Sequence, residues 1–251
     1  MRRLGVVAAL AAALLCASSA LAAPTWRECV DAAKAFAAGR AGTVYFFLTT
    51  QSGRHFGYYG RRVAPSASVL KAMLLVAYLH RPSVRHRDLT DAERSLLGPM
   101  IRRSSNTAAN QVITTLGPRQ VNRLARRVGM EHFVLHLRIW GLSEITARDQ
   151  AYFFRNIDGY VPRHHRRYAM RLLASIVPSQ RWGIPPVKPD GWNIYFKGGW
   201  GSGTGRVTHQ VALLRRDRIR ISLAVLTQWN PSQLYGERTI RGVARRLFRG
   251  L

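Results

Sequence analysis

The sequence predicts an α+β fold, with one antiparallel sheet flanked by N- and C-terminal helices and an all-helical lobe inserted between the strands. Segments rich in β-branched and aromatic residues lie in the first third of the chain (residues 43–60) and in the last third (192–227). Between them, apolar residues recur at helical spacing. Strands from both ends of the chain are therefore expected to share one sheet.

The first third of the chain predicts a helix, a hairpin and a second helix. Apolar residues recur at helical spacing over residues 25–38. Two strand-like segments, residues 43–50 and 55–60, are separated by a Ser-Gly break, which is typical of a hairpin. Residues 64–79 are strongly apolar and predict a buried helix that the chain enters through Pro65.

The middle of the chain predicts a series of helices. Thr90 and Glu93 have the spacing of a capping box, which predicts a short helix over residues 89–97. Gly117-Pro118 separates two further helical segments, because proline cannot continue the hydrogen-bond ladder of the preceding helix. These two segments are residues 111–116 and 120–128. A further helix is expected to start at Thr146, because Asp149 follows three residues later, as in a helix cap. Another helix is expected over residues 168–177.

The last third of the chain predicts three strands and a closing helix. Residues 192–197, 207–214 and 219–227 have strand composition, and Asp217 falls in the turn between the last two. Residues 237–251 place apolar side chains on one stripe and arginines opposite, so this helix is expected to pack on the sheet.

The N-terminus has the pattern of a signal peptide. Arg2 and Arg3 precede an apolar run over residues 6–15, and small residues follow at positions 20–22. We expect residues 1–22 to be removed on export to the periplasm or the medium, leaving no membrane-spanning segment. The mature chain would be one monomeric domain, residues 23–251, with an α/β lobe (23–66 and 190–251) and a helical lobe (67–189).

The chain is strongly basic. Its formal charge is +27, and removal of Arg2 and Arg3 would leave 27 − 2 = +25. Such a charge attracts anionic polymers, and a cell-envelope polymer is a candidate partner. No nucleic-acid partner is expected, because the arginines are spread along the chain without a recognisable nucleic-acid-binding module. An arginine-biased proteome would also explain the charge.

Ser68 and Lys71 form the most informative pair in the sequence. Residues three apart share a face of a helix, so the Lys71 amine is expected to reach the Ser68 hydroxyl. A serine becomes a good nucleophile when a base takes its proton, and a desolvated lysine can be that base. Arginine cannot replace it, and lysine is rare here: only 4 of the 39 basic residues are lysines.

Two further motifs follow, Ser104-x-Asn106 and Lys197-Gly198-Gly199. With Ser68-x-x-Lys71 they resemble the motif set of class A β-lactamases and penicillin-binding proteins. The resemblance implies a β-lactamase or D,D-peptidase-like fold and a serine hydrolase that uses no metal or cofactor. It implies that Ser68 is acylated, Lys71 is its base, Ser104 relays a proton, and Asn106 holds Lys71 and the substrate amide.

The same resemblance implies that the strand carrying the third motif binds the substrate. Lys197 would lower the pKa of Lys71 and attract the substrate carboxylate. Gly199 lets the strand approach closely, and the backbone N–H groups of Ser68 and Trp200 would form the oxyanion hole. Arg206 stands where related enzymes often hold the substrate carboxylate.

The sequence also departs from the family pattern. No glutamate has the setting of the residue that deacylates class A β-lactamases, and Glu131 is the best remaining candidate. We interpret Glu144 and Asp149 as partners of the helix start at Thr146. Gly198 replaces a threonine or serine, and Ser105 replaces an aspartate. Acylation is expected to be intact, and deacylation to be slow.

Three functions are compatible with these observations. The first is a hydrolase that opens β-lactam amides through an acyl-enzyme at Ser68. The second is a carboxypeptidase or transpeptidase acting on D-Ala-D-Ala peptides. The third, motivated by the positive charge and the missing glutamate, is a non-catalytic, cationic cell-envelope binding protein that kept the fold.

Overall fold

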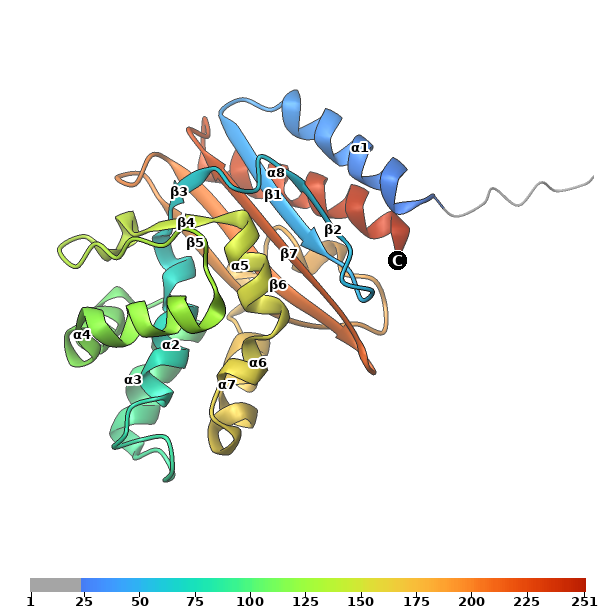
Figure 1. The fold of residues 1–251 in the computed structure, drawn as a ribbon. Helices are drawn as coiled ribbons and strands as arrows, with labels where there is room; N and C mark the ends of the chain where they lie inside the picture. Colours follow the sequence, from blue (N-terminus) through green and yellow to red (C-terminus); the bar gives the residue numbers. More distant parts are fainter. Residues whose placement is uncertain (1–23) are drawn as a thin grey trace, which may run out of the picture.

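Five antiparallel strands form the central sheet of the computed structural model, which describes residues 24–251. The proposed signal peptide lies outside the described residues. The strand order is β2-β1-β7-β6-β5, so the first and last thirds of the chain share the sheet, as predicted (Figure 1). The strands are β1 (Thr43–Thr49), β2 (His55–Tyr58), β5 (Asn193–Gly201), β6 (Val207–Arg216) and β7 (Ile219–Gln228).

Helices cover both faces of this sheet. The terminal helices α1 (Trp26–Ala38) and α8 (Gln233–Leu247) lie together on one face, with α8 packed against β6 and β7 (Figure 1). On the opposite face, α5 (Ala147–Arg155) packs against β1, β6 and β7. The remaining helices form the helical lobe: α2 (Leu70–Leu79), α3 (Asp91–Arg102), α4 (Asn106–Val128), α6 (Ile157–Tyr160) and α7 (Arg166–Ala174).

Several helix starts are fixed by side-chain caps. The predicted capping box of Thr90 and Glu93 is formed at the start of α3, where each side chain binds the other residue's backbone N–H. Thr146 accepts a hydrogen bond from the Asp149 backbone N–H and so caps α5, as expected. Ser105 caps α4 in the same way, by accepting from the Ala108 backbone N–H.

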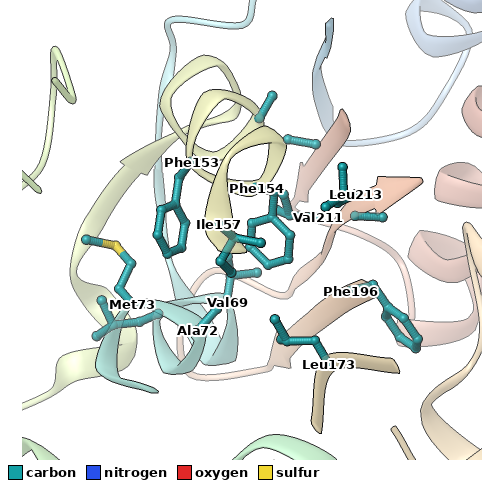
Figure 2. Close-up of a cluster of buried hydrophobic side chains, with 14 of the residues drawn as sticks. Val69, Ala72, Met73, Phe153, Phe154, Ile157, Leu173, Phe196, Val211 and Leu213 are labelled. Atoms are coloured by element: carbon teal, nitrogen blue, oxygen red, sulfur yellow. The ribbon is translucent and has the colours of Figure 1, made fainter. Parts of the chain in front are cut away.

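The core is continuous between the sheet and the helical lobe. All ten residues of α2 are buried, because this helix is surrounded by other elements on every side. Figure 2 shows how its side chains meet those of α5, β5 and β6 in one apolar cluster. Burial of each such side chain contributes about 1.5–3 kcal/mol, so the position of α2, and of the residues at its start, is strongly determined. The cluster includes Val69, Ala72, Met73, Phe153, Phe154, Phe196, Val211 and Leu213.

The predicted helix over residues 64–79 is wrong in its first turns. Pro65 ends a short strand, β3 (Val63–Pro65), which pairs with β4 (Glu144–Thr146). A 3₁₀ turn, η1 (Ala67–Val69), comes before α2, and Ala67 has a φ of 42°. This left-handed conformation interrupts a continuous helix. Pro65 is therefore not a helix start.

Other boundaries differ by a few residues. The helix predicted over residues 89–97 extends to Arg102 as α3, although Pro99 lies inside it. The two helices predicted on either side of Gly117-Pro118 form α4, whose axis is broken at Gly117 (φ 61°, ψ 174°). Within residues 24–251, no helix combines the length and the apolar character needed to cross a bilayer.

Candidate active site

Ser68 lies in the 3₁₀ turn before α2, where its side chain is at the edge of the core. Its exposed fraction is 9%, so the residue is largely buried but keeps some contact with solvent. Strand β5 passes directly beside this turn. A Cβ atom added to Gly199 would lie 2.8 Å from the Ser68 backbone nitrogen and 2.9 Å from that of Val69. Only glycine permits this approach of strand to turn.

Lys71 is fully buried in the first turn of α2. Its Nζ lies 2.5 Å from the Ser104 carbonyl oxygen, 2.7 Å from Asn106 Oδ1 and 3.2 Å from Ser104 Oγ. Two of these acceptors belong to Ser104 in the loop between α3 and α4, and the third belongs to Asn106, the first residue of α4. Ser104 has a φ of 57°, and this left-handed conformation turns the chain toward Lys71 just before α4 begins.

Lys197 is also fully buried, on β5, the strand at the edge of the sheet. Its Nζ donates to the Gly198 carbonyl oxygen at 2.7 Å and to Ser104 Oγ at 3.1 Å. The Ser104 hydroxyl therefore lies between the two lysine amines. The structure thus brings together residues from all three sequence motifs: Lys71, Ser104, Asn106 and Lys197 through hydrogen bonds, and Ser68 through the contact of its backbone with Gly199.

The predicted direct contact between Ser68 and Lys71 is not formed as a hydrogen bond among the residues that the structure describes. Lys71 Nζ instead binds the acceptors of Ser104 and Asn106. Ser68 and Lys71 are nevertheless three residues apart where the 3₁₀ turn runs into α2, so their side chains start from the same side of this helical segment.

The environment lowers the pKa values of both lysines. Burial lowers the pKa of Lys71 from 10.5 to about 7, because desolvation disfavours the charged form. Burial, and then the charge of Lys71, hold the pKa of Lys197 well below its ordinary value. Near neutral pH the Lys71 amine is therefore able to accept a proton, which is the property that a general base requires.

Trp182 explains why glycine occupies position 198. A Cβ atom on Gly198 would lie 3.0 Å from Cη2 and 3.1 Å from Cζ2 of the Trp182 indole. A threonine or serine there would require this ring to move away by a few tenths of an ångström. Trp182 also packs edge-on against Trp200, with the ring centroids 5.9 Å apart. The missing hydroxyl is thus replaced by an aromatic pair beside Lys197.

The structure places Arg206 in the turn between β5 and β6. Its side chain is exposed, and within residues 24–251 it forms no hydrogen bond or ion pair. Its backbone carbonyl oxygen binds the Asn230 side chain at 2.9 Å. A role of Arg206 in binding the substrate carboxylate stays a prediction.

Three acidic residues between the second and third motifs, including the best candidate for a deacylating base, are engaged elsewhere. Glu131 forms ion pairs with Arg148 at 2.9 Å and with Arg61 at 3.3 Å. Glu144 lies in β4 and binds His132 at 2.7 Å, so its interpretation as a partner of the α5 start is wrong. Asp149 does lie in the first turn of α5, as expected.

Trp140 is a site residue that the sequence did not reveal. It belongs to the loop between α4 and α5, and its ring centroid lies 4.9 Å from Lys71 Nζ. Its Nε1 donates to Asn110 Oδ1 at 2.7 Å, and its carbonyl oxygen accepts from Ser66 Oγ. The indole therefore covers one side of the Lys71 amine and contributes to its desolvation. The sequence around Trp140 has no helical or strand periodicity, so it gave no indication that this side chain would lie next to Lys71.

An α+β fold in which the Ser104 hydroxyl lies between two buried lysines, next to the turn that carries Ser68, is typical of β-lactamase-like serine hydrolase folds. The Beta-lactamase enzyme family matches residues 92–251. This match covers more than half of the chain, and the chain belongs to that family. Ser104, Asn106 and Lys197 lie inside the matched region, whereas Ser68 and Lys71 precede it. No curated protein sequence matches the chain.

Solved structures of the same fold extend the match over most of the chain. A β-lactamase from Sphaerobacter thermophilus DSM 20745 is 22% identical, with a TM-score of 0.76 over 89% of this chain and 96% of that one. A β-lactamase from Xanthomonas campestris pv. campestris is 17% identical, with a TM-score of 0.76 over 88% and 97%. PBP-A is 20% identical, with a TM-score of 0.72 over 88% and 94%. These likenesses establish the fold.

The lowered pKa of Lys71 can be measured directly, because the chain has few lysines. In protein labelled with ¹³C at the lysine ε-carbons, we expect the Lys71 signal to titrate with a midpoint near pH 7. The signal is assigned by its loss in Lys71→Arg. A Lys71 midpoint near the ordinary lysine value of about 10.4 would show that the amine is hydrated and charged at neutral pH.

The contact of Gly199 with the serine turn gives a second prediction. In Gly199→Ala the added methyl group must push the turn and β5 apart, since it would otherwise lie 2.8 Å from the Ser68 nitrogen. We expect reaction of Ser68 with an acylating probe to slow at least tenfold while the thermal midpoint falls by a few degrees. Gly203→Ala, which meets no atom within 4 Å, is the matched control and should react at the parent rate.

Proposed function

We propose that this protein is an exported serine hydrolase that opens β-lactam amides by forming an acyl-enzyme at Ser68 and releases the acyl group slowly. The observation that carries the proposal is the Ser104 hydroxyl, which lies 3.2 Å from the Lys71 amine and 3.1 Å from the Lys197 amine. A hydroxyl between two amines of lowered pKa is suited to proton transfer. Export rests on the signal-peptide pattern of residues 1–22.

In the proposed acylation, Ser68 Oγ attacks the carbonyl carbon of the amide and its proton passes to the neutral Lys71 amine. The C–O bond forms and the C–N bond then breaks. The leaving nitrogen takes a proton from Ser104 Oγ, which is replenished from Lys71. Asn106 Oδ1 and the Ser104 carbonyl oxygen keep the Lys71 amine in position while its charge changes.

The oxyanion and the substrate carboxylate have separate proposed sites. The backbone N–H groups of Ser68 and Trp200 would bind the oxyanion, and the tight packing of Gly199 on the serine turn supports this arrangement. One such donor is worth about 3 kcal/mol of transition-state stabilisation. Lys197 would attract the carboxylate, and the exposed guanidinium of Arg206 is a second candidate partner.

Slow deacylation follows from what surrounds Lys71. Hydrolysis of the ester needs a water molecule and a base that can activate it. Glu131 is held by two arginines, and the Trp140 ring, 4.9 Å from the Lys71 amine, would restrict the access of a water molecule to it. The acyl-enzyme is therefore expected to be long-lived.

A second candidate function is that of a D-Ala-D-Ala carboxypeptidase or transpeptidase. It shares the acylation step, and the structural likeness to PBP-A favours it. The third, a non-catalytic binding protein, predicts no covalent adduct. Comparing hydrolysis of a chromogenic β-lactam with release of D-alanine from a cell-wall peptide separates the first two functions.

Acylation itself can be tested by mass spectrometry of the intact protein after incubation with penicillin. We expect a mass increase equal to that of the drug, located on the peptide that contains Ser68. Ser68→Ala should give no adduct, and Lys71→Arg should acylate at least about a hundredfold more slowly, because guanidinium cannot accept the proton. Absence of an adduct on the parent protein would favour the binding protein over both enzymes.

The role of Trp140 can be tested by the lifetime of that adduct. In Trp140→Ala, water gains access to Lys71, and we expect the acyl-enzyme to be released about tenfold faster or more. Trp140→Phe keeps a ring over the amine and should retain the parent lifetime to within about threefold. An equally long lifetime in Trp140→Ala would mean that the ring does not limit deacylation.

A further inference from the structure

A hollow of about 540 Å³ lies at the far end of α2 from the candidate active site. Its floor is apolar and is formed by Ala77, Leu116 and Leu124. Its rim is cationic, with Arg85 on one side and three arginines of α4 on the other. These α4 residues are Arg119, Arg123 and Arg127.

A second hollow, of about 690 Å³, continues the first. The two share His80 and Arg85, and the second adds a further arginine and two histidines. Together they form a groove, which we name the α2–α4 groove. No carboxylate lines it among residues 24–251. The added residues are His86, Arg163 and His164.

Most guanidinium groups of this groove have no partner within the described residues and can bind a ligand. Within the described residues, the side chains of Arg85, Arg119 and Arg123 form no hydrogen bond, ion pair or contact with an aromatic ring. The hollow between α1 and α8 is also rich in arginine, but there Arg40 and Arg246 lie over the Phe36 ring. Arginines in that hollow contribute to packing, whereas those of the α2–α4 groove do not.

The spacing of the α4 arginines concentrates their charge. Arg119, Arg123 and Arg127 are four residues apart in the part of α4 that follows the break at Gly117. Side chains at this spacing share one helix face, and like charges there destabilise a helix by about 0.2–0.5 kcal/mol per pair. Arg127 Nη1 lies 2.9 Å from a ring nitrogen of His80, which orients this guanidinium along the groove. An anionic ligand would relieve the repulsion.

We propose that the α2–α4 groove binds a polymer that carries several phosphate groups. Planar guanidinium groups bind phosphate oxygens in pairs, and a row of them matches a chain of repeated anions. The two connected hollows offer room for more than one phosphate. Neither hollow is lined by a tryptophan, tyrosine or phenylalanine on which a nucleobase could stack, so the groove suits a phosphate backbone rather than single-stranded nucleic acid.

The groove and the candidate active site are two separate places on the molecule. They lie at opposite ends of α2, whose ten residues span about 15 Å. A bound polymer would therefore leave Ser68 uncovered. The groove would hold the protein on a phosphate-rich surface while the active site meets its own substrate, and it does not depend on the proposed enzymatic activity.

The test is binding of linear inorganic polyphosphate to the full chain, measured by titration calorimetry at several salt concentrations. The groove variant is Arg85→Gln, Arg119→Gln and Arg123→Gln combined. The matched control combines Arg27→Gln, Arg171→Gln and Arg218→Gln, three exposed arginines outside both arginine-rich hollows whose side chains form no hydrogen bond or ion pair within residues 24–251. Both variants lose the same charge, and circular dichroism checks that both are folded.

We expect the groove variant to bind at least tenfold more weakly and to lose about one unit of salt dependence per arginine, as for phosphate contacts in nucleic acids. The control should change less than threefold. Equal losses in the two variants would mean that overall charge alone attracts the polymer, and would overturn the proposal. So would binding of a polyuronate, which carries carboxylates, as tight as that of polyphosphate.

Discussion

Two buried amines sharing a single hydroxyl are the constraint on which the rest of the site depends. Lys71 and Lys197 both point at Ser104 Oγ, and a neutral hydroxyl cannot compensate two positive charges in a medium without water. With no carboxylate among the hydrogen-bond partners of either amine in the described structure, the two charges are relieved by loss of a proton. Burial in the packed fold thus lowers the pKa of Lys71, so that its amine can act as a base.

The rest of the architecture serves to keep these groups in place. The buried helix α2 carries Lys71, the edge strand β5 carries Lys197, and the left-handed turn at Ser104 lies between them. Each belongs to a different part of the chain, and the apolar cluster between α2, α5 and the sheet holds the parts together (Figure 2). The precision that proton transfer requires comes from this packing, because rigid elements position groups better than loops.

The sequence predicted the fold and the main site residues because both leave local signals. Strand composition and capping boxes are local, so β1, the start of α3 and the cap at Thr146 were found. What it missed depends on tertiary contact. The 3₁₀ turn at Ser68 follows a short strand, β3, that forms only by pairing with the distant β4, and Trp140 reaches Lys71 through the path of a loop. The groove of arginines depends on which helices lie side by side.

The break in α4 has a geometric consequence. Asn106, which holds Lys71, lies in the first part of this helix, and the three groove arginines lie beyond Gly117. The non-helical dihedral angles at Gly117, next to Pro118, end one helical segment and let the next begin in its own direction. The direction of the arginine row is therefore not dictated by the direction of the turn that presents the Asn106 amide to the amine.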